Sequence, residues 1–350
     1  MQTKDYSTIF TSDLVKRFVS DYKLPIPLFS KRWEDFEYFL TLYEGEFEAY
    51  SKWRKLYDLI QERYGGMPGK FVEDFYKRRE EVVQFFHNNP AQKEFVEMDM
   101  NQFAIKDRPN VTSKNIYNGN GVGKVFISID LKKANFQAMR FVNPALVDNA
   151  KTYDEFISKF ADFDYFRESK YLRQVVFGQS NPKRQITVEA YLIHKVWGEW
   201  NEFYPQYTNL VSLANDEFVI EVGKVNQCEV PTEEMLKQFV WFIKGKLGLE
   251  ITAECFLLLA KTLIAKGESK PVQTFFIKTY LDKSEEIMCL PLNYRAIATK
   301  LLWGRHLVEQ DYHFPYDGYD CRFCEEFELI DGMAPSNKEK RTGMEENDKS

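Results

Sequence analysis

A short apolar run, FISID at residues 126–130, constrains the fold of this chain more than any other stretch. Its isoleucines and phenylalanine predict a buried β-strand, yet the run ends in a carboxylate, Asp130. A buried strand does not need an acid, and a surface turn would more often use glycine or asparagine. We therefore interpret Asp130 as a side chain held at the edge of a sheet, where it could bind a metal ion.

The composition is that of a soluble globular protein with a substantial core. The chain has 350 residues, of which 44% are hydrophobic, 29% charged and 16% aromatic, enough for one large domain or two. The net charge of −6 argues against a surface that binds nucleic acid on every side, but it allows a basic channel on one face. We expect no secretory signal and no membrane-spanning segment. Five cysteines, an odd number, indicate a reducing compartment, the cytoplasm.

Hydrophobic periodicity divides the chain into helical and strand-forming stretches. Aromatic residues at helical spacing predict helices over residues 12–88, and an alternating pattern predicts a strand over residues 92–103. Residues 107–124 are rich in Asn and Gly and form the predicted boundary loop. The expected regions are residues 1–106 (helical), 107–124 (loop), 125–290 (α+β), 291–331 (small and helical) and 332–350 (a disordered tail).

Beyond Asp130 the sequence predicts helices over residues 152–200 and then a β-hairpin. The hairpin turns at Asn215-Asp216 between two apolar strands, as these turn residues favour. A helix is expected over residues 231–248, where Gly248 ends it, and another follows it. The remaining predicted elements are a strand over 272–281 and a helix over 293–310.

Asp130 and the two acids of the hairpin, Asp216 and Glu217, suggest a shared metal site. Carboxylates from separate strand ends can hold two divalent cations roughly 4 Å apart, and such pairs of ions catalyse nucleotidyl transfer. The alternative is that Asp216 and Glu217 are solvated turn residues, as is common for Asn-Asp pairs.

The order of the segments resembles the palm of reverse transcriptases and related viral polymerases. The similar segments are ISIDLKKANF (motif A, a strand ending in Asp), FGQSNPKRQITVEAYLIHKV (motif B, a turn before a helix), LANDEFVIEV (motif C, an acidic hairpin) and LKQFVWFIKGKLGLEI (motif D, a helix ending in Gly-Leu). The resemblance covers about residues 124–260. It implies an α+β fold with a right-hand polymerase-like palm, a fingers-like region before the loop and a small thumb-like region at 291–331.

This resemblance also implies a function and a set of site residues. The function is nucleotidyl transfer with two Mg²⁺ or Mn²⁺ ions, nucleoside triphosphates and a nucleic-acid template or primer. Asp130, Asp216 and Glu217 would be the catalytic, metal-binding residues. Asn135 would face the sugar of the incoming nucleotide, with Phe136 as an aromatic gate if the backbone is shifted by one residue. The other nucleotide-binding residues would be Arg167, Lys170 and Arg173, placed on one helix face, and Gly178, Gln179, Asn181, Lys183 and Arg184.

The chain departs from the family pattern in three places. Motif C reads Asn-Asp-Glu where the family has two aspartates, and motif B reads Gly178-Gln179 in inverted order. Cys255 stands near the position of the family's lysine, with Lys261 further along the chain. The identity of a cationic proton donor to the leaving pyrophosphate therefore stays open.

Other functions also fit the sequence. The hairpin is similar to the Gly-Gly-Asp-Glu-Phe hairpin of diguanylate cyclases, so a nucleotide cyclase is the second hypothesis. The third is a non-catalytic accessory protein of a virus or mobile element that retains a degenerate palm. A possible zinc site consists of the CxxC pair Cys321 and Cys324 with His306 and His313. The sequence leaves the oligomeric state open.

Overall fold

The structure is a computed structural model that describes residues 4–28, 32–109, 111, 116–268, 271–317 and 319–332. The chain forms two compact units. The first comprises Met1–Lys114, Phe126–Val222 and Glu229–Cys255, and the second comprises Asn115–Val125, Gly223–Cys228 and Phe256–Ser350. Each unit has buried hydrophobic side chains of its own.

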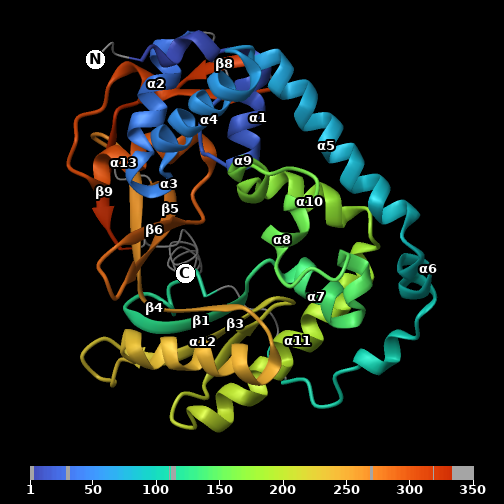
Figure 1. The fold of residues 1–350 in the computed structure, drawn as a ribbon. Coiled ribbons are helices and arrows are strands. Elements are labelled where there is room, and N and C mark those ends of the chain that lie inside the picture. Colours follow the sequence, from blue (N-terminus) through green and yellow to red (C-terminus); the bar gives the residue numbers. More distant parts are fainter. Residues whose placement is uncertain are drawn as a thin grey trace, which may run out of the picture. The chain divides into compact units, whose positions relative to one another are not determined.

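The amino-terminal part of the first unit is helical (Figure 1). Helix α1 (Ser12–Tyr22) begins after Thr11, whose hydroxyl accepts a hydrogen bond from the amide of Leu14 at 3.3 Å and so caps the helix. Phe18 of α1 and Trp53 of α4 are fully buried, with ring centroids 5.1 Å apart. The other helices of this part are α2 (Trp33–Leu42), α3 (Glu44–Phe47), α4 (Ala49–Tyr64), α5 (Pro68–Asn88) and α6 (Pro90–Glu97), with short 3-10 turns at Tyr6–Ile9 and Met100–Phe103.

Four strands lie side by side in the first unit in the order β2-β3-β1-β4. They are β1 (Lys124–Leu131), β2 (Leu210–Leu213), β3 (Glu217–Lys224) and the first residues of β4 (Ile251–Ala265). The Leu131 amide donates to the Asp216 carbonyl at 2.8 Å, and the Lys132 amide donates to the Glu250 carbonyl at 3.0 Å. The end of β1 therefore meets the beginnings of β3 and β4, so these neighbours run antiparallel.

Two long helices cover one face of this sheet (Figure 1). Trp197 of α11 (Pro182–Phe203) meets Phe218 of β3 at 5.3 Å, and Trp200 meets Phe239 of α12 (Glu233–Leu247) at 4.8 Å between ring centroids. The chain thus follows a strand–helix–strand–strand–helix–strand path. Between β1 and α11 lie α7 (Ala134–Val142), a 3-10 turn (Pro144–Val147), α8 (Tyr153–Ser158), α9 (Asp164–Glu168) and α10 (Lys170–Gly178).

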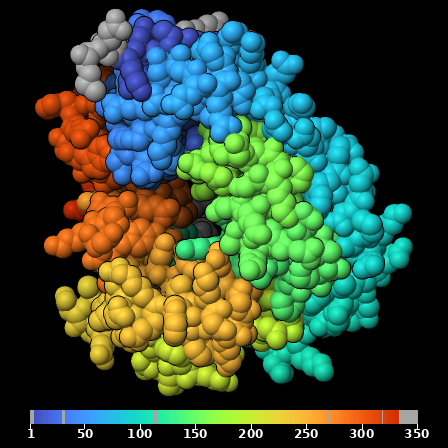
Figure 2. Space-filling view, in the orientation of Figure 1, coloured from blue at the N-terminus to red at the C-terminus, as the bar shows by residue number. Residues whose placement is uncertain are grey.

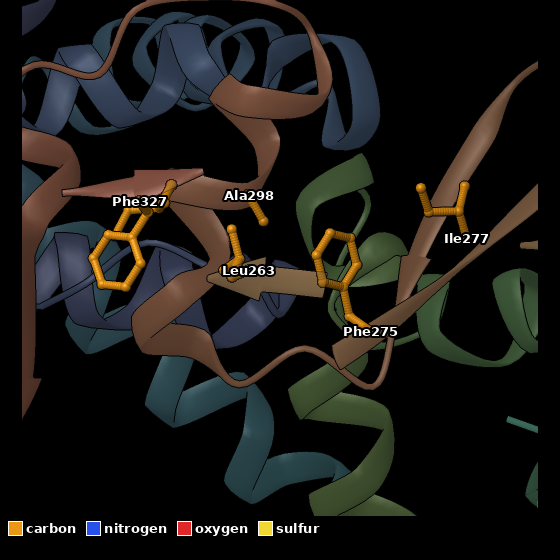
Figure 3. Close-up of a cluster of buried hydrophobic side chains, with 6 residues drawn as sticks. Leu263, Phe275, Ile277, Ala298 and Phe327 are labelled. Atoms are coloured by element: carbon orange, nitrogen blue, oxygen red, sulfur yellow. The ribbon is translucent and has the colours of Figure 1, made fainter. Parts of the chain in front are cut away.

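The second unit is built around the later part of β4. That strand pairs antiparallel with β5 and also with β9, and β5 pairs with β6. Leu263, Phe275 and Phe327 belong to its hydrophobic core, together with side chains of α13 (Figure 3). Its elements are β5 (Pro271–Tyr280), β6 (Glu285–Met288), α13 (Arg295–Leu302), β7 (His313–Tyr316), β8 (Tyr319–Arg322) and β9 (Phe327–Asp331), with 3-10 turns at Leu292–Tyr294 and Glu309–Tyr312.

Two predicted elements have the wrong type of secondary structure. The strand expected over 92–103 is helix α6 and a 3-10 turn, because Asn89 caps the Ala91 amide at 3.0 Å and Ala91 and Phe95 bury one helix face. The helix expected after Gly248 is strand β4. Its long apolar sequence is compatible with either structure, and pairing with distant strands decides the outcome.

The mixed α/β class, the helical amino-terminal region and the hairpin at Asn215-Asp216 are confirmed. The predicted helical region 291–331 contains three strands besides α13, and the compact units divide within β4 rather than at residue 290. The later part of β4 belongs to the second unit because it pairs with β5 and β9 of that unit. Disorder is predicted for residues 332–350. All of these except Gly332 lie outside the described part of the chain. No helix among the described residues is long and apolar enough to cross a membrane.

Candidate functional site

The structure brings Asp130 and Asp216 to adjacent strand ends. Asp130 is the next-to-last residue of β1, and the following amide, that of Leu131, bonds to the Asp216 carbonyl. Both side chains are half-buried. On the other side, the Thr252 hydroxyl reaches the Asp130 carbonyl at 3.5 Å. The backbones at Asp130 and Asp216 are therefore neighbours across β1 and the start of β3.

Glu217 is held by a neighbour of Asp130. The Ser128 hydroxyl donates to a Glu217 carboxylate oxygen at 2.5 Å. Side chains alternate along a strand, so Ser128 and Asp130 share one face of β1, and Glu217 is turned toward that face. Phe218, the next residue of β3, packs on α11 instead.

A further carboxyl group, Glu189, was not identified from the sequence. It lies on α11 and is only 9% exposed. Burial, together with the negative charge of Asp216, raises the pKa of Glu189 to about 7. The only sequence signal was an acid placed on the apolar stripe of a helix.

Glu189→Gln is expected to change the free energy of unfolding, relative to the unmodified protein, more favourably at pH 8 than at pH 5. The ordinary pKa of 4.5 applies to the unfolded chain, and the folded value is about 7. Above pH 4.5 the unfolded chain ionises while the fold retains its proton, so stability falls until about pH 7 and is then constant. Between pH 5 and pH 8 the unmodified protein therefore loses roughly 2–3 kcal/mol of its free energy of unfolding. The Gln variant does not show this loss, because Gln does not ionise. Urea unfolding at the two pH values measures it.

Glu202→Gln is the matched control, because Glu202 is an exposed acid on the same helix. Its substitution removes an acid from the same helix without uncovering buried surface, so it should change stability by no more than a few tenths of a kcal/mol. An equal effect of Glu189→Gln at pH 5 and pH 8 would show that Glu189 titrates as an ordinary surface carboxyl.

Asp130 and Asp216 are the carboxylates at these strand ends that could hold a divalent cation. Among the described residues, no three His, Cys, Asp or Glu side chains lie close enough together to hold a metal, so no closed protein cage is present. Mg²⁺ commonly uses one or two carboxylates and completes its shell with water and substrate phosphates. A cation beside Asp216 would offset the negative charge that, after burial, raises the pKa of Glu189.

Cationic side chains gather around a buried tyrosine close to Asp130 in the sequence. Lys133 Nζ lies 4.9 Å and Arg173 Cζ 5.9 Å from the ring centroid of Tyr153. Tyr153 is 1% exposed, and its hydroxyl is buried without a hydrogen-bond partner in the described part of the chain. Burial, partly offset by the charge of Arg173, raises the pKa of Tyr153. Lys133 also pairs with Asp154 at 2.7 Å.

Asn135 and Phe136, the two residues expected to face the sugar, differ in how deeply they are buried. Phe136 is 3% exposed and meets Tyr153 and Phe177 at 6.2 and 6.4 Å between ring centroids. Asn135 is half-buried in the first turn of α7. Phe136 is therefore a core residue, and Asn135 is the more accessible of the two.

The predicted single helix with Arg167, Lys170 and Arg173 is wrong. The chain breaks at Ser169, whose hydroxyl caps the Leu172 amide at 3.0 Å and donates to Asp21 at 2.7 Å. Arg167 therefore lies on α9 and Lys170 and Arg173 on α10. Arg167 bonds to Asp164 and to the Ser158 hydroxyl.

The motif B turn is held mainly by side chains that bond to backbone groups. Arg184 donates to the carbonyls of Phe95 and Met98 at 3.1 and 2.7 Å, which ties α11 to α6. Asn181 has a φ of 55° and caps α11. The remaining residues of the predicted set, Gly178, Gln179 and Lys183, are exposed.

The four zinc candidates are not brought to one place. His313 of β7 lies opposite Arg322 of β8, whereas Cys321 lies opposite Phe314, so His313 and Cys321 occupy opposite faces of the ladder. The ring nitrogens of His313 contact Asp320 at 2.9 Å and Glu309 at 3.4 Å. His306 and Cys324 are exposed. Metal analysis of the purified protein would test the zinc prediction.

Comparison of the chain with protein-family models, with curated proteins and with solved structures finds no match.

Proposed function

We propose that the chain is a nucleotidyltransferase of the polymerase type, with a palm formed by the sheet of the first unit. The supporting observation is the meeting of Asp130 with Asp216 across antiparallel neighbours β1 and β3. The β-α-β-β-α-β path with strand order β2-β3-β1-β4 is that of a split βαβ unit. That path carries motif A to the centre of the sheet and motif C to the strand beside it.

In this proposal each carboxylate has a defined place. Asp130 and Asp216 would hold divalent cations, which when bound activate the attacking hydroxyl and neutralise the leaving phosphate. Glu217 is oriented by Ser128 on the face shared with Asp130. Glu189, near enough to Asp216 for the two charges to interact, would add negative charge to the site when ionised.

The triphosphate would lie near Lys133, Arg173 and Tyr153. The two cations flank one ring, and the buried Tyr153 hydroxyl is able to donate a hydrogen bond. Lys133 precedes helix α7, and its side chain makes no capping hydrogen bond to the helix. The amino-terminus of a helix attracts anions. Lys133 would exchange Asp154 for phosphate oxygens.

Replacing Lys133 and Arg173 singly with Ala is expected to raise the KM for nucleotide about tenfold or more each. A hydrogen bond to a charged group contributes about 1.5–3 kcal/mol, and the kcat should change less than the KM. Steady-state kinetics over a range of nucleotide concentration measures both. Lys159→Ala removes an exposed lysine that pairs with Asp148 at 2.7 Å and serves as the control. Equal kinetics of all the variants would place the phosphates elsewhere.

Asn135→Phe is expected to shift substrate preference from ribonucleotides toward deoxyribonucleotides. An amide leaves room for a 2′-hydroxyl and can bond to it, whereas a phenyl ring fills that space. Phe136 is already packed in the core, so it is not available as the gate. Competition between the two nucleotide types gives the ratio of kcat/KM values. Strong exclusion of ribonucleotides by the unmodified protein would contradict this assignment.

The proposed function is tested by incubating the protein with labelled nucleotides, Mg²⁺ or Mn²⁺, and RNA or DNA templates with primers. Products longer than the primer support a polymerase. Cyclic nucleotide products would instead identify a cyclase. No product under any of these conditions, with a folded protein, would favour the non-catalytic alternative.

A further inference from the structure

Helix α12 presents a tryptophan to solvent. Trp241 is 81% exposed, although Phe239 and Ile243 on the opposite side of the helix are fully buried. Figure 2 shows α12, in gold, at the surface of the face turned to the viewer. A large aromatic side chain exposed to this extent is uncommon, and exposed aromatic residues recur at binding sites.

The neighbours of Trp241 on the helix surface carry no acid. Residues three and four positions away share its face, and these are Lys237, Gln238, Lys244 and Gly245. A Cβ atom built at Gly245 would meet nothing within 4 Å, so the helix is flat and open beside the indole. A glycine inside a helix is destabilising relative to alanine, and packing within the chain does not require this one.

We propose that the surface formed by Lys237, Trp241, Lys244 and Gly245 binds single-stranded nucleic acid. A base would stack on the indole, with the flat position at Gly245 giving it room, and the lysines would contact phosphates. The side chains of Lys237 and Lys244 are 65% and 66% exposed, in ion pairs with Glu233 at 2.7 Å and Glu250 at 3.2 Å. Exposed pairs of this kind are weak, so the lysines can exchange them for phosphate.

The charges favour a polyanion over a second copy of this chain. In a two-fold contact between antiparallel α12 helices centred on Trp241, Lys237 of one copy would face Gly245 of the other, and Lys244 would face Gln238. Neither lysine would then meet an acid at the facing position, whereas a phosphate backbone complements both lysines. This surface uses none of the residues of the carboxylate site, so the inference does not depend on the proposed function.

The inference is tested by fluorescence anisotropy with a labelled oligothymidylate and with its RNA counterpart at low salt. Trp241→Ala is expected to weaken binding about tenfold or more, and Trp241→Phe to retain most of it, because a phenyl ring still stacks. Replacing both Lys237 and Lys244 with Ala should reduce the slope of log affinity against log salt by about 1.4.

Two control variants test whether binding depends on this surface alone. Trp303→Ala removes another exposed tryptophan, one that lies 4.8 Å from the Arg305 guanidinium, and should leave binding unchanged. Asp130→Asn should also bind normally, whatever its effect on activity. Unchanged binding by Trp241→Ala overturns the inference. So does a smaller molar mass of Trp241→Ala in light scattering, which would assign the tryptophan to a contact between copies.

Discussion

Asp130→Asn is expected to reduce nucleotide incorporation by about 10³-fold or more, with little change in the thermal midpoint. Loss of one carboxylate removes several kcal/mol of charge stabilisation in the transition state, and each 1.36 kcal/mol corresponds to a factor of ten. Asparagine has almost the same volume as aspartate, and residue 130 is half-buried at a strand end. Primer extension measures the loss, and differential scanning calorimetry measures the midpoint.

Asp148→Asn is the matched control for this substitution. Asp148 is exposed, with a φ of 53° that asparagine tolerates, and its carboxylate pairs with Lys159. It should retain full activity. An Asp130→Asn protein that incorporates nucleotide normally would remove Asp130 from the catalytic site. One that unfolds but keeps residual activity would make Asp130 a structural residue.

The path of the chain beyond Asp130 was predictable where the signals are local. Asn215-Asp216 fixes a hairpin through turn chemistry, and Thr232 and Gly248 mark the ends of α12 as a cap and a left-handed stop. Strand β4 was missed because its residues are apolar without a clear period. Its pairing with β5 and β9, both later in the sequence, specifies the strand.

In the candidate site, too, local sequence signals mark some residues, whereas others depend on tertiary packing. The positions of Asp130 near the end of an apolar strand and of Asp216 in a hairpin turn follow from local signals, and the order of strands places their backbones side by side. Glu189 and Tyr153 could not be predicted as site residues. The burial of Glu189 depends on the packing of α11. Tyr153, on α8, meets Lys133 at the start of α7 and Arg173 on α10 only in the folded chain.

A buried polar network joins α1 to the α9–α10 junction. Asp21 is fully buried and accepts hydrogen bonds from Arg17 Nε at 2.8 Å, from the Tyr165 hydroxyl at 2.7 Å and from the Ser169 hydroxyl at 2.7 Å. The Arg17 guanidinium lies 4.0 Å from the ring centroid of Tyr171. Because Ser169 also caps α10, this network fixes the start of the helix that carries Arg173.

Asp21→Asn is therefore expected to destabilise the protein by about 3–5 kcal/mol, because it leaves the buried Arg17 charge without its counter-ion. Asp13→Asn, an exposed acid in the first turn of the same helix, should cost no more than about 1 kcal/mol. Replacing both partners, with Arg17→Met and Asp21→Leu, should be less damaging than Asp21→Asn alone, since no unpaired charge remains. Urea unfolding measures the free energy of unfolding of these three variants. A single Asp21→Asn variant as stable as Asp13→Asn would mean that the network does not hold α10 in place, and the position of Arg173 would then need another cause.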